Sequence, residues 1–250
     1  MLTIGSLFSG IGGLELGLEW AGLGPTLWQV ESDEFCRKVL ERHWPDADRS
    51  VTDVKQAGRA NLVPVDLICG GAPCQDLSAA GKGAGITGVR SGLWFEFHRV
   101  VWALEPTWVV FENVGSAAIR WVDHVMEGLE QLGYEALPVP LSAVDVGAPH
   151  RRARVFVVAH SDVEPLRQQP RWKCRQGGQG SSLPWEFGSC RGAPGPPNWA
   201  TSPSICGVDD GVPRRMDRLR GLGNAVVPQC AEVIGWVVRE AMSNAVRETG

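Results

Sequence analysis

Short apolar runs alternate with segments of helical spacing through the first 160 residues, and this alternation constrains the fold more than any other feature. Strands are predicted at residues 2–8, 26–30, 65–69, 108–111, 136–141 and 155–159. Helices are predicted between them, at residues 11–20, 34–43, 93–104 and 124–132. Strands that alternate with helices favour a parallel sheet with helices on both faces. We therefore predict an α/β fold with a doubly wound, mainly parallel sheet.

The alternation stops near residue 160. Residues 161–220 are rich in Gly, Pro, Ser and Arg and show neither strand nor helix periodicity. A helical pattern returns at residues 230–247, and we expect that helix to pack back on the first part of the chain. The sequence thus predicts one domain made of residues 1–160 and 221–250, with a small irregular segment at 161–220.

Charge is unevenly distributed between the two halves of the chain. The net charge of −4 does not by itself indicate a nucleic-acid partner. Residues 1–150 hold 10 Lys and Arg against 19 Asp and Glu, whereas residues 151–250 hold 14 against 9. A basic segment attached to an acidic body suits contact with phosphates, although a solvated basic loop explains the charge equally well.

Composition argues against several other classes of protein. The seven cysteines are widely spaced with no Cys-x-x-Cys pair, so neither a disulfide framework nor a metal site is expected. No apolar run approaches the ~20 residues that span a bilayer. The N-terminus enters a strand pattern without a basic leader, which predicts a cytoplasmic protein with no membrane partner.

Cys74 is the residue with the clearest chemical meaning. It lies in the run Gly-Gly-Ala-Pro-Cys-Gln at 70–75, directly after the predicted strand 65–69. The carboxyl ends of parallel strands are where α/β enzymes place their chemistry. An average cysteine is more often a small buried hydrophobic residue. The glycine-rich stretch 81–88 that follows favours a reactive thiol instead.

Glu112 follows the predicted strand 108–111, which would place it near Cys74. A carboxyl group raises the pKa of a nearby thiol, so this pairing is useful only if the carboxyl protonates a ring that the thiol attacks. The alternative role is a helix cap or an ion-pair partner. If a strand begins at Arg154, then Arg152 and Arg154 point to one face and could bind carbonyl or phosphate oxygens, or form surface ion pairs.

A nucleoside site is indicated near the N-terminus. Gly10, Gly12 and Gly13 lie in the first strand-to-helix turn, where backbone N–H groups are open to a ligand. Glu15 stands where a dinucleotide fingerprint has its third glycine. Glu31 ends the second predicted strand and suits ribose hydroxyls, and Asp53 suits an adenine amino group.

The ordered set of motifs resembles that of DNA cytosine-5 methyltransferases. The matching runs are Phe8-Ser9-Gly10-Ile11-Gly12-Gly13, Glu31, Asp53, 70–78, Glu112-Asn113-Val114, Arg152-Ala153-Arg154 and 223–228. The resemblance covers residues 1–160 and 221–240. It implies the fold of S-adenosylmethionine-dependent methyltransferases, with S-adenosylmethionine as the methyl donor. The acceptor it implies is a cytosine flipped out of double-stranded DNA.

The resemblance also implies a role for each matching residue. Cys74 would add to C6 of cytosine, Glu112 would contact N3 and Arg154 would hold O2. Arg152 would support the loop that carries Cys74, and Pro73 would shape that loop. The donor pocket would be lined by Phe8, Gly10, Ile11, Gly12, Gly13, Glu31, Asp53, Val54, Leu93, Asn224 and Val226.

Residues 161–220 would form a small basic target-recognition segment. Arg191, Arg214 and Arg215 would contact the DNA, and the protein would act as a monomer without a metal ion. The segment has about 60 residues, fewer than is usual for the family, and His150 replaces the family's usual glutamine. Three alternatives stay open: a transfer RNA cytosine-5 methyltransferase, a catalytically silent DNA-binding regulator, and a cysteine-dependent enzyme acting on free pyrimidine nucleotides.

Overall fold

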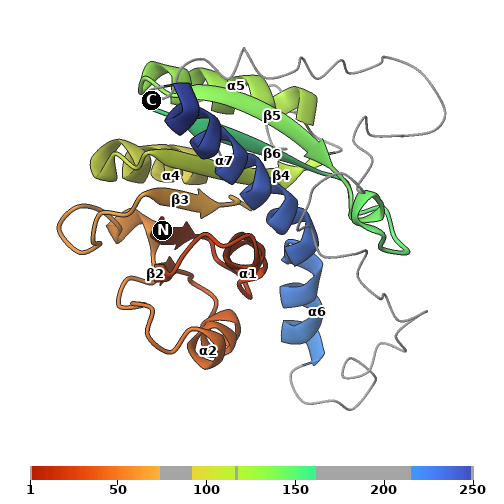
Figure 1. Cartoon of the computed structure of the whole chain (residues 1–250). Helices are drawn as coiled ribbons and strands as arrows, with labels where there is room; N and C mark the ends of the chain where they lie inside the picture. Colours follow the sequence, from red (N-terminus) through yellow and green to blue (C-terminus); the bar gives the residue numbers. More distant parts are fainter. Residues whose placement is uncertain (1, 74–91, 116–117, 162–214, 249–250) are drawn as a thin grey trace.

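The computed structural model describes residues 2–73, 92–115, 118–161 and 215–248, and a six-stranded sheet forms its centre (Figure 1). The strands are β1 (Ile4–Leu7), β2 (Thr26–Val30), β3 (Leu67–Gly70), β4 (Trp108–Val114), β5 (Glu135–Leu141) and β6 (Arg154–His160). Their order across the sheet is β2-β1-β3-β4-β6-β5. The first four are parallel, whereas β6 runs antiparallel to both β4 and β5. The predicted mainly parallel α/β sheet is confirmed.

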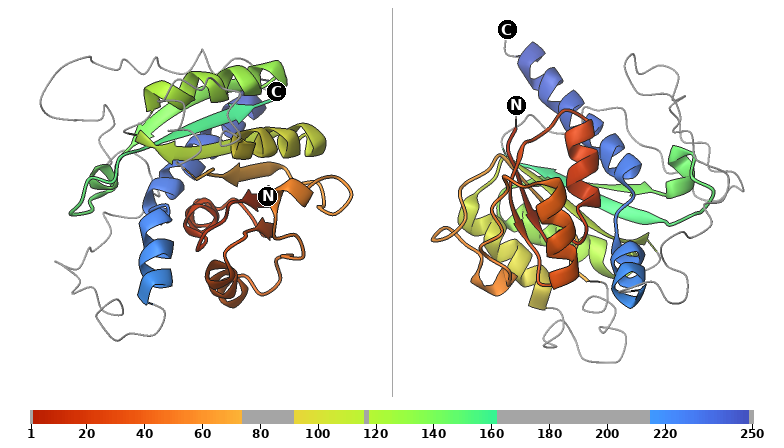
Figure 2. Two further views of the ribbon diagram at one scale, coloured as in Figure 1. Left: turned by 180° about the vertical axis from the view of Figure 1, so that it is seen from behind. Right: turned by 90° about the horizontal axis from the view of Figure 1, so that it is seen from below.

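Helices cover both faces of this sheet (Figure 2). The helices of the structure are α1 (Gly13–Trp20), α2 (Glu34–His43), α4 (Gly92–Leu104), α5 (Ala118–Gln131), α6 (Arg215–Asn224) and α7 (Pro228–Glu248), with 3-10 turns η1 (Val54–Gln56) and η4 (Ala143–Val146). Helix α6 lies beside α2 rather than on the sheet. Trp94, Phe97 and Trp121 of α4 and α5 bury one face. Leu18 of α1 and Ile234 of α7 bury the other. The two separate cores are typical of a doubly wound sheet.

The C-terminal helix α7 packs against α1, as the sequence predicted for residues 230–247. Two glycines allow the close approach. A Cβ on Gly17 would lie 2.1 Å from the carbonyl oxygen of Pro228, and one on Gly235 would lie 2.4 Å from the Cβ of Ala21. Arg239 adds a hydrogen bond from Nη1 to the carbonyl oxygen of Ala21 at 2.7 Å. Residues far apart in sequence therefore share one helical layer.

Replacing Gly17 by alanine should destabilise the fold, because the added methyl group meets backbone that cannot move aside cheaply. We expect a loss of about 1–3 kcal/mol in the free energy of unfolding, the usual cost of overpacking. Urea unfolding followed by circular dichroism measures it. Gly58→Ala is the control, since its Cβ would meet only the Arg99 side chain, at 3.6 Å. Equal stability of the two variants would contradict this account of the α1–α7 contact.

Two element boundaries differ from the sequence prediction in ways that affect the site. Strand β4 continues to Val114, so Glu112 lies within the strand rather than after it. The extension arises because β6 pairs with β4 along its whole length, from Trp108↔His160 to Val114↔Arg154. Helix α6 was not predicted, and it begins inside the segment assigned to target recognition. The division into two domains stays a prediction.

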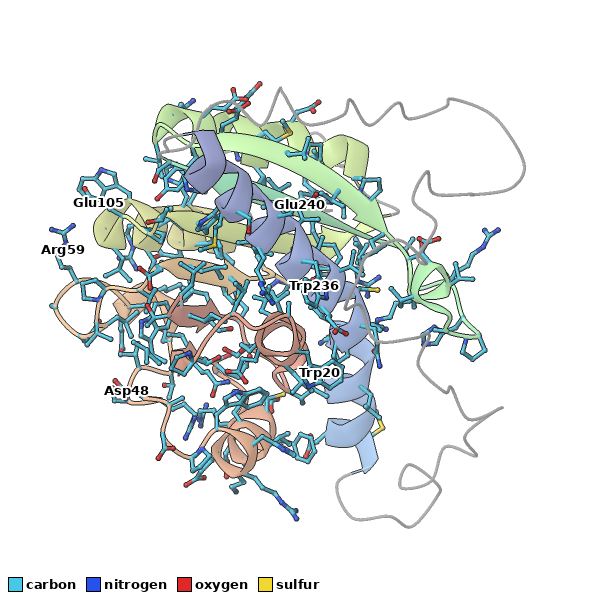
Figure 3. All side chains as sticks on the ribbon, viewed as in Figure 1. Trp20, Asp48, Arg59, Glu105, Trp236 and Glu240 are labelled. Atoms are coloured by element: carbon cyan, nitrogen blue, oxygen red, sulfur yellow. The ribbon has the colours of Figure 1, made fainter. Side chains whose placement is uncertain are left out.

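The surface of the described residues offers few other chemical features. Arg59, near η1, and Glu105, after α4, form an exposed ion pair at one edge of the molecule (Figure 3). Within the described ranges, no helix is both long and apolar enough to cross a bilayer. The same residues contain no group of three or more His, Cys, Asp or Glu side chains placed to hold a metal ion.

Candidate active site

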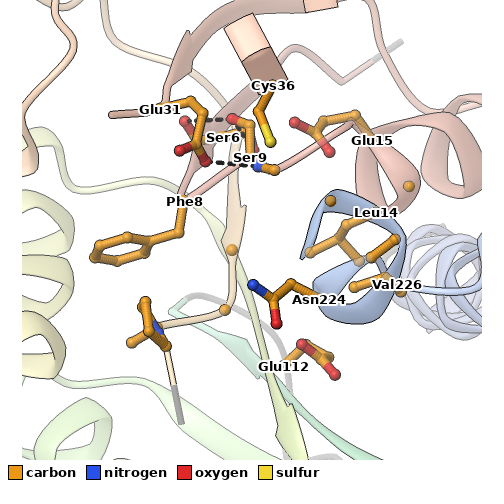
Figure 4. Close-up of a pocket in the computed structure, with 18 of the residues that line it drawn as sticks. Ser6, Phe8, Ser9, Leu14, Glu15, Glu31, Cys36, Glu112, Asn224 and Val226 are labelled. Carbon is orange, nitrogen blue, oxygen red and sulfur yellow. Dashed lines mark hydrogen bonds between the residues drawn. The ribbon is translucent and has the colours of Figure 1, made fainter. Parts of the chain in front are cut away.

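A cavity of about 470 Å³ opens where the carboxyl ends of β1 to β4 meet the segment that follows α6 (Figure 4). Its size is within the range of pockets that hold small ligands and cofactors. The predicted site residues that line it are Phe8, Gly10, Gly13, Glu31, Pro73, Glu112, Arg154, Asn224 and Val226. The strand ends thus gather the N-terminal glycine turn, the Glu112 region and the C-terminal segment around one space.

The glycine turn after β1 depends on backbone conformations that favour glycine. Gly10 and Gly12 have φ of +56° and +86°, and Gly12 precedes the first residue of α1. A Cβ on Gly10 would meet nothing within 4 Å, so this side of the turn is open. A Cβ on Gly13 would lie 2.3 Å from the carbonyl oxygen of Val226, so α1 and the C-terminal segment touch here.

Glu31, the first residue after β2, is held firmly at the wall of the pocket. Its Oε2 accepts a hydrogen bond from the backbone N–H of Gly10 at 2.7 Å, and its Oε1 accepts one from the N–H of Asp33 at 2.8 Å. Arg37 of α2 donates from Nη1 to the backbone carbonyls of Glu31 and Ser32. The carboxylate keeps further lone pairs that can accept from a ligand's hydroxyl groups.

The Glu112 carboxyl group is buried beside a guanidinium. Arg154 Nε lies 2.8 Å from Glu112 Oε1, and the Glu112 residue is only 8% exposed. Burial raises the pKa of Glu112 to about 7, even though Arg154 and Arg152 act to lower it. A carboxyl group with a pKa near neutrality can hold or release a proton under working conditions.

Asn113 ties this strand to the loop that leads to Cys74. Its Nδ2 donates to the backbone carbonyl of Ala72 at 2.9 Å, and its Oδ1 accepts from the N–H of Val114 at 2.8 Å. The residue is 3% exposed. The motif Glu-Asn-Val contained this residue, but the sequence reasoning gave it no role. The structure shows that it anchors residue 72, just before Pro73.

Arg152 contacts the end of α6 and the residues that follow it. Its Nη2 donates to the backbone carbonyls of Gly223, at 2.8 Å, and Ala225. These hydrogen bonds hold the segment that brings Asn224 to the pocket. The loop from Cys74 onward, which the resemblance implies Arg152 supports, lies outside the described residues, so that role stays a prediction. Strand β6 begins at Arg154, and Arg152 has φ of +37° before it, so strand alternation does not govern its direction.

Five predicted cofactor contacts lie away from the lining of the cavity, and further predicted site residues fall outside the described ranges. Ile11, Gly12, Asp53, Val54 and Leu93 do not line it; Asp53 Oδ1 instead accepts from the N–H of Lys55 at the start of η1. Cys74, Arg191, Arg214 and the stretch 81–88 are not among the described residues. Arg215 is the first residue of α6, and its side chain is not described.

A polar cluster that the sequence reasoning missed lies under the glycine turn. Glu15 of α1 has no exposed surface, and burial raises its pKa to about 7. Around it are Ser6 of β1, Ser9 and Gln29 of β2, all buried. Ser9 Oγ donates to Ser6 Oγ at 2.8 Å. The signal in the sequence was the acidic residue at the third glycine position of a nucleotide-binding turn.

Comparison with known proteins decides the family. The model of C-5 cytosine-specific DNA methylases matches residues 2–177, which is more than half of the chain. The chain belongs to this family. Methyltransferases of this kind use S-adenosylmethionine in general, and the acidic pocket with its glycine turn is the candidate place for it in this chain.

Several type II methyltransferases are similar to this chain. M.NgoBI of Neisseria gonorrhoeae is 32% identical over 164 residues, which are 64% of this chain and 51% of M.NgoBI. M.AquIA of Picosynechococcus sp. is 34% identical over 176 residues, 62% of this chain and 70% of the relative. M.HgiEI of Herpetosiphon aurantiacus is 35% identical over 158 residues, but the match spans only 36% of it. The match therefore spans about half or less of two of these three relatives.

Solved structures show the same fold. A protein proposed to be a DNA modification methyltransferase, encoded within a prophage of E. coli, is 28% identical with a TM-score of 0.53. The match covers 64% of the present chain and 47% of that chain. The S. pombe Dnmt2 methyltransferase is 17% identical with a TM-score of 0.54, over 66% of the present chain and 50% of that chain. The second likeness shows the fold alone.

Proposed function

We propose that this protein transfers a methyl group from S-adenosylmethionine to C5 of a cytosine flipped out of double-stranded DNA. The observation that carries the proposal is the buried Glu112–Arg154 pair, which shares one cavity with the glycine turn and Glu31. This reaction requires a site for a nucleoside cofactor. It also requires a buried acid close to the segment that leads from β3 to Cys74. The type II methyltransferases among the relatives support DNA as the substrate.

The pocket fits a nucleoside sulfonium cofactor. Glu31 offers fixed acceptor oxygens for ribose hydroxyls, and the turn at Gly10 leaves open space for a ligand to approach the backbone. Asn224 and Val226 close the pocket from the C-terminal side. When bound, S-adenosylmethionine supplies an electrophilic methyl group on a positively charged sulfur. An acidic lining suits that charge.

Side chains of this protein activate the cytosine and move the protons. C5 of cytosine is a weak nucleophile, so the Cys74 thiolate forms a bond to C6 and pushes electron density toward C5 and N3. Glu112, held half protonated near pH 7, donates its proton at N3, and Arg154 orients Glu112 and holds O2. After the methyl group joins C5, water takes the C5 proton, N3 returns its proton to Glu112, and the bond between C6 and sulfur breaks. Free Cys74 is thereby restored.

Reaching the target base requires extrusion from the duplex, which costs a few kcal/mol. Residues 161–220, with Arg191, Arg214 and Arg215, are proposed to supply contacts to the DNA that offset this cost. These contacts lie outside the described side chains, so their assignment rests on charge and position in the sequence. A monomer in the cytoplasm of a bacterial or phage-infected cell remains the prediction of the sequence.

A mechanism-based trap tests the proposal. Duplex DNA containing 5-fluorocytosine should form a stable covalent adduct with the protein in the presence of S-adenosylmethionine, because fluorine cannot leave C5 as a proton does. The adduct appears as a shifted band on a denaturing gel. Transfer RNA carrying the same base is run in parallel. An adduct with RNA alone would replace DNA as the substrate, and no adduct with either would refute the covalent mechanism.

A further inference from the structure

The pocket proposed for the cofactor carries more negative than positive charge. Of the described residues that line it, four are acidic, and Arg154 is the one basic residue. Arg154 pairs with Glu112, and the Glu31 oxygens accept from backbone N–H groups. Asp33 accepts from the N–H of Cys36 at the start of α2. Glu15 is the one of these four described residues for which neither an ion pair nor a backbone N–H donor is found at the carboxyl oxygens.

Glu15 is buried among neutral polar groups only. The side chain has no exposed surface; Ser6, Ser9 and Gln29 lie close enough to lower its pKa, but neither carboxyl oxygen has a well-directed hydrogen bond with a described residue. It approaches the cavity from the first turn of α1, next to Ser9 (Figure 4). A carboxylate in that position loses the hydration it has in water, so its charged form is costly unless a positive charge comes close.

The groups that face Glu15 do not supply that positive charge. Ser6 of β1 and Gln29 of β2 are neutral. Arg49 Nη1 donates to Gln29 Oε1 at 2.9 Å, so this guanidinium bonds Gln29 and not Glu15. Cys69 of β3 is buried, and the pKa of its thiol is well above the usual range, so it stays neutral.

Two further groups complete the surroundings. Glu19, one turn along α1, is acidic, and its carboxylate accepts hydrogen bonds from Thr26 Oγ1 and Trp44 Nε1. Cys36 of α2 lines the same cavity. Burial is therefore the largest influence on the ionisation of Glu15. It raises the pKa of this carboxyl group to about 7, so the group is largely protonated at slightly acid pH.

We infer that Glu15 gives up its proton when S-adenosylmethionine binds, so that a buried carboxylate balances the sulfonium charge and the pocket distinguishes the methyl donor from S-adenosylhomocysteine. The inference rests on the proposed function, since it takes that cofactor as the ligand. The balance is simple: the Glu15 O–H bond breaks, the proton passes to the buffer, and no other bond changes. The demethylated product carries no charge on sulfur, so it gives Glu15 no reason to ionise.

The sign of the pH dependence follows from this exchange. A nearby cation lowers the pKa of Glu15, so the complex holds fewer protons than the free protein. Affinity for S-adenosylmethionine therefore rises with pH up to about 7, by at most tenfold per pH unit, and levels off above it. Affinity for S-adenosylhomocysteine should change little over the same range.

Isothermal titration calorimetry tests the inference on the whole chain. Titrations at pH 6.5 in two buffers with different ionisation enthalpies give the number of protons released. We expect about 0.7 proton per S-adenosylmethionine and close to none per S-adenosylhomocysteine. In Glu15→Gln the release with S-adenosylmethionine should disappear, and the preference for the donor should shrink. Circular dichroism checks that the variant is folded.

Glu112→Gln is the matched control, because Glu112 lines the same cavity and its pKa is also raised to about 7. This variant should keep the proton release. Two results would overturn this inference and leave the proposed function standing. One is equal proton release with the two ligands; the other is proton release that persists in Glu15→Gln and vanishes in Glu112→Gln. Should Glu15→Gln not fold, the comparison of the two ligands on the unaltered chain still decides. Binding of neither ligand would overturn the proposed cofactor as well.

Discussion

Replacing Cys74 by serine should abolish methyl transfer to DNA, with a loss of about 10³-fold or more, in line with other nucleophile replacements. A serine hydroxyl is a far weaker nucleophile than a thiolate at neutral pH, so the addition to C6 would not proceed. Transfer of labelled methyl groups from S-adenosylmethionine to duplex DNA measures the loss. The covalent adduct with 5-fluorocytosine should disappear in parallel.

The matched control for this change is Cys69→Ala, five residues earlier in the chain. Cys69 is fully buried in β3, where burial raises the pKa of its thiol and leaves it unsuited to attack. That variant should keep the adduct and most of the activity. Calorimetric binding of S-adenosylmethionine should be similar in both variants and in the unaltered protein. Near-normal transfer by Cys74→Ser would disprove the covalent mechanism.

Glu112→Gln should lower the rate of methyl transfer by about 10²–10⁴-fold, the usual contribution of a general acid. The amide is close in shape and can still face Arg154, but it has no proton to give at N3. Single-turnover transfer with enzyme in excess over DNA measures the chemical step. Glu105→Gln offers a control, since Glu105 carries the same carboxyl group in an exposed ion pair with Arg59.

The same substitution should also change the pH profile of the reaction. Glu112 must hold its proton to donate it, and its pKa is about 7 in the described structure. The rate of the unaltered protein should therefore fall as pH rises above about 7, and Glu112→Gln should lack this fall. If the rate falls above pH 7 in the same way in both proteins, the fall belongs to the titration of another group. If Glu112→Gln loses little of the rate at any pH, Glu112 acts only as a structural partner of Arg154.

Several features of the fold follow from local patterns in the sequence. Strand β2 and helix α2 have the boundaries that hydrophobic spacing predicted, because each buries one face whose period is visible within a few residues. The glycine turn before α1 was also predicted, since left-handed backbone and close contacts with other segments favour glycine. Such relations join residues that are close in sequence.

The site depends on relations that span the chain. The Glu112–Arg154 ion pair requires β6 to run antiparallel beside β4, and nothing in either strand's own spacing specifies that direction. The contact of Arg152 with Gly223 and Ala225 likewise joins segments about 70 residues apart. Strand alternation placed Arg152 and Arg154 on one face, but Arg152 lies before the strand begins, so alternation does not set its direction.

By itself, the sequence determined the α/β class, the order of the motifs and the family they resemble, because periodicity and short motifs are local properties of the chain. Only the tertiary structure decided that Glu15 lies buried beneath the glycine turn and that Glu112 is held beside Arg154. The reason is that burial and ionisation depend on everything packed around a group. For Glu15 this means α1, β1, β2 and β3 together, and their positions are set by the assembled sheet.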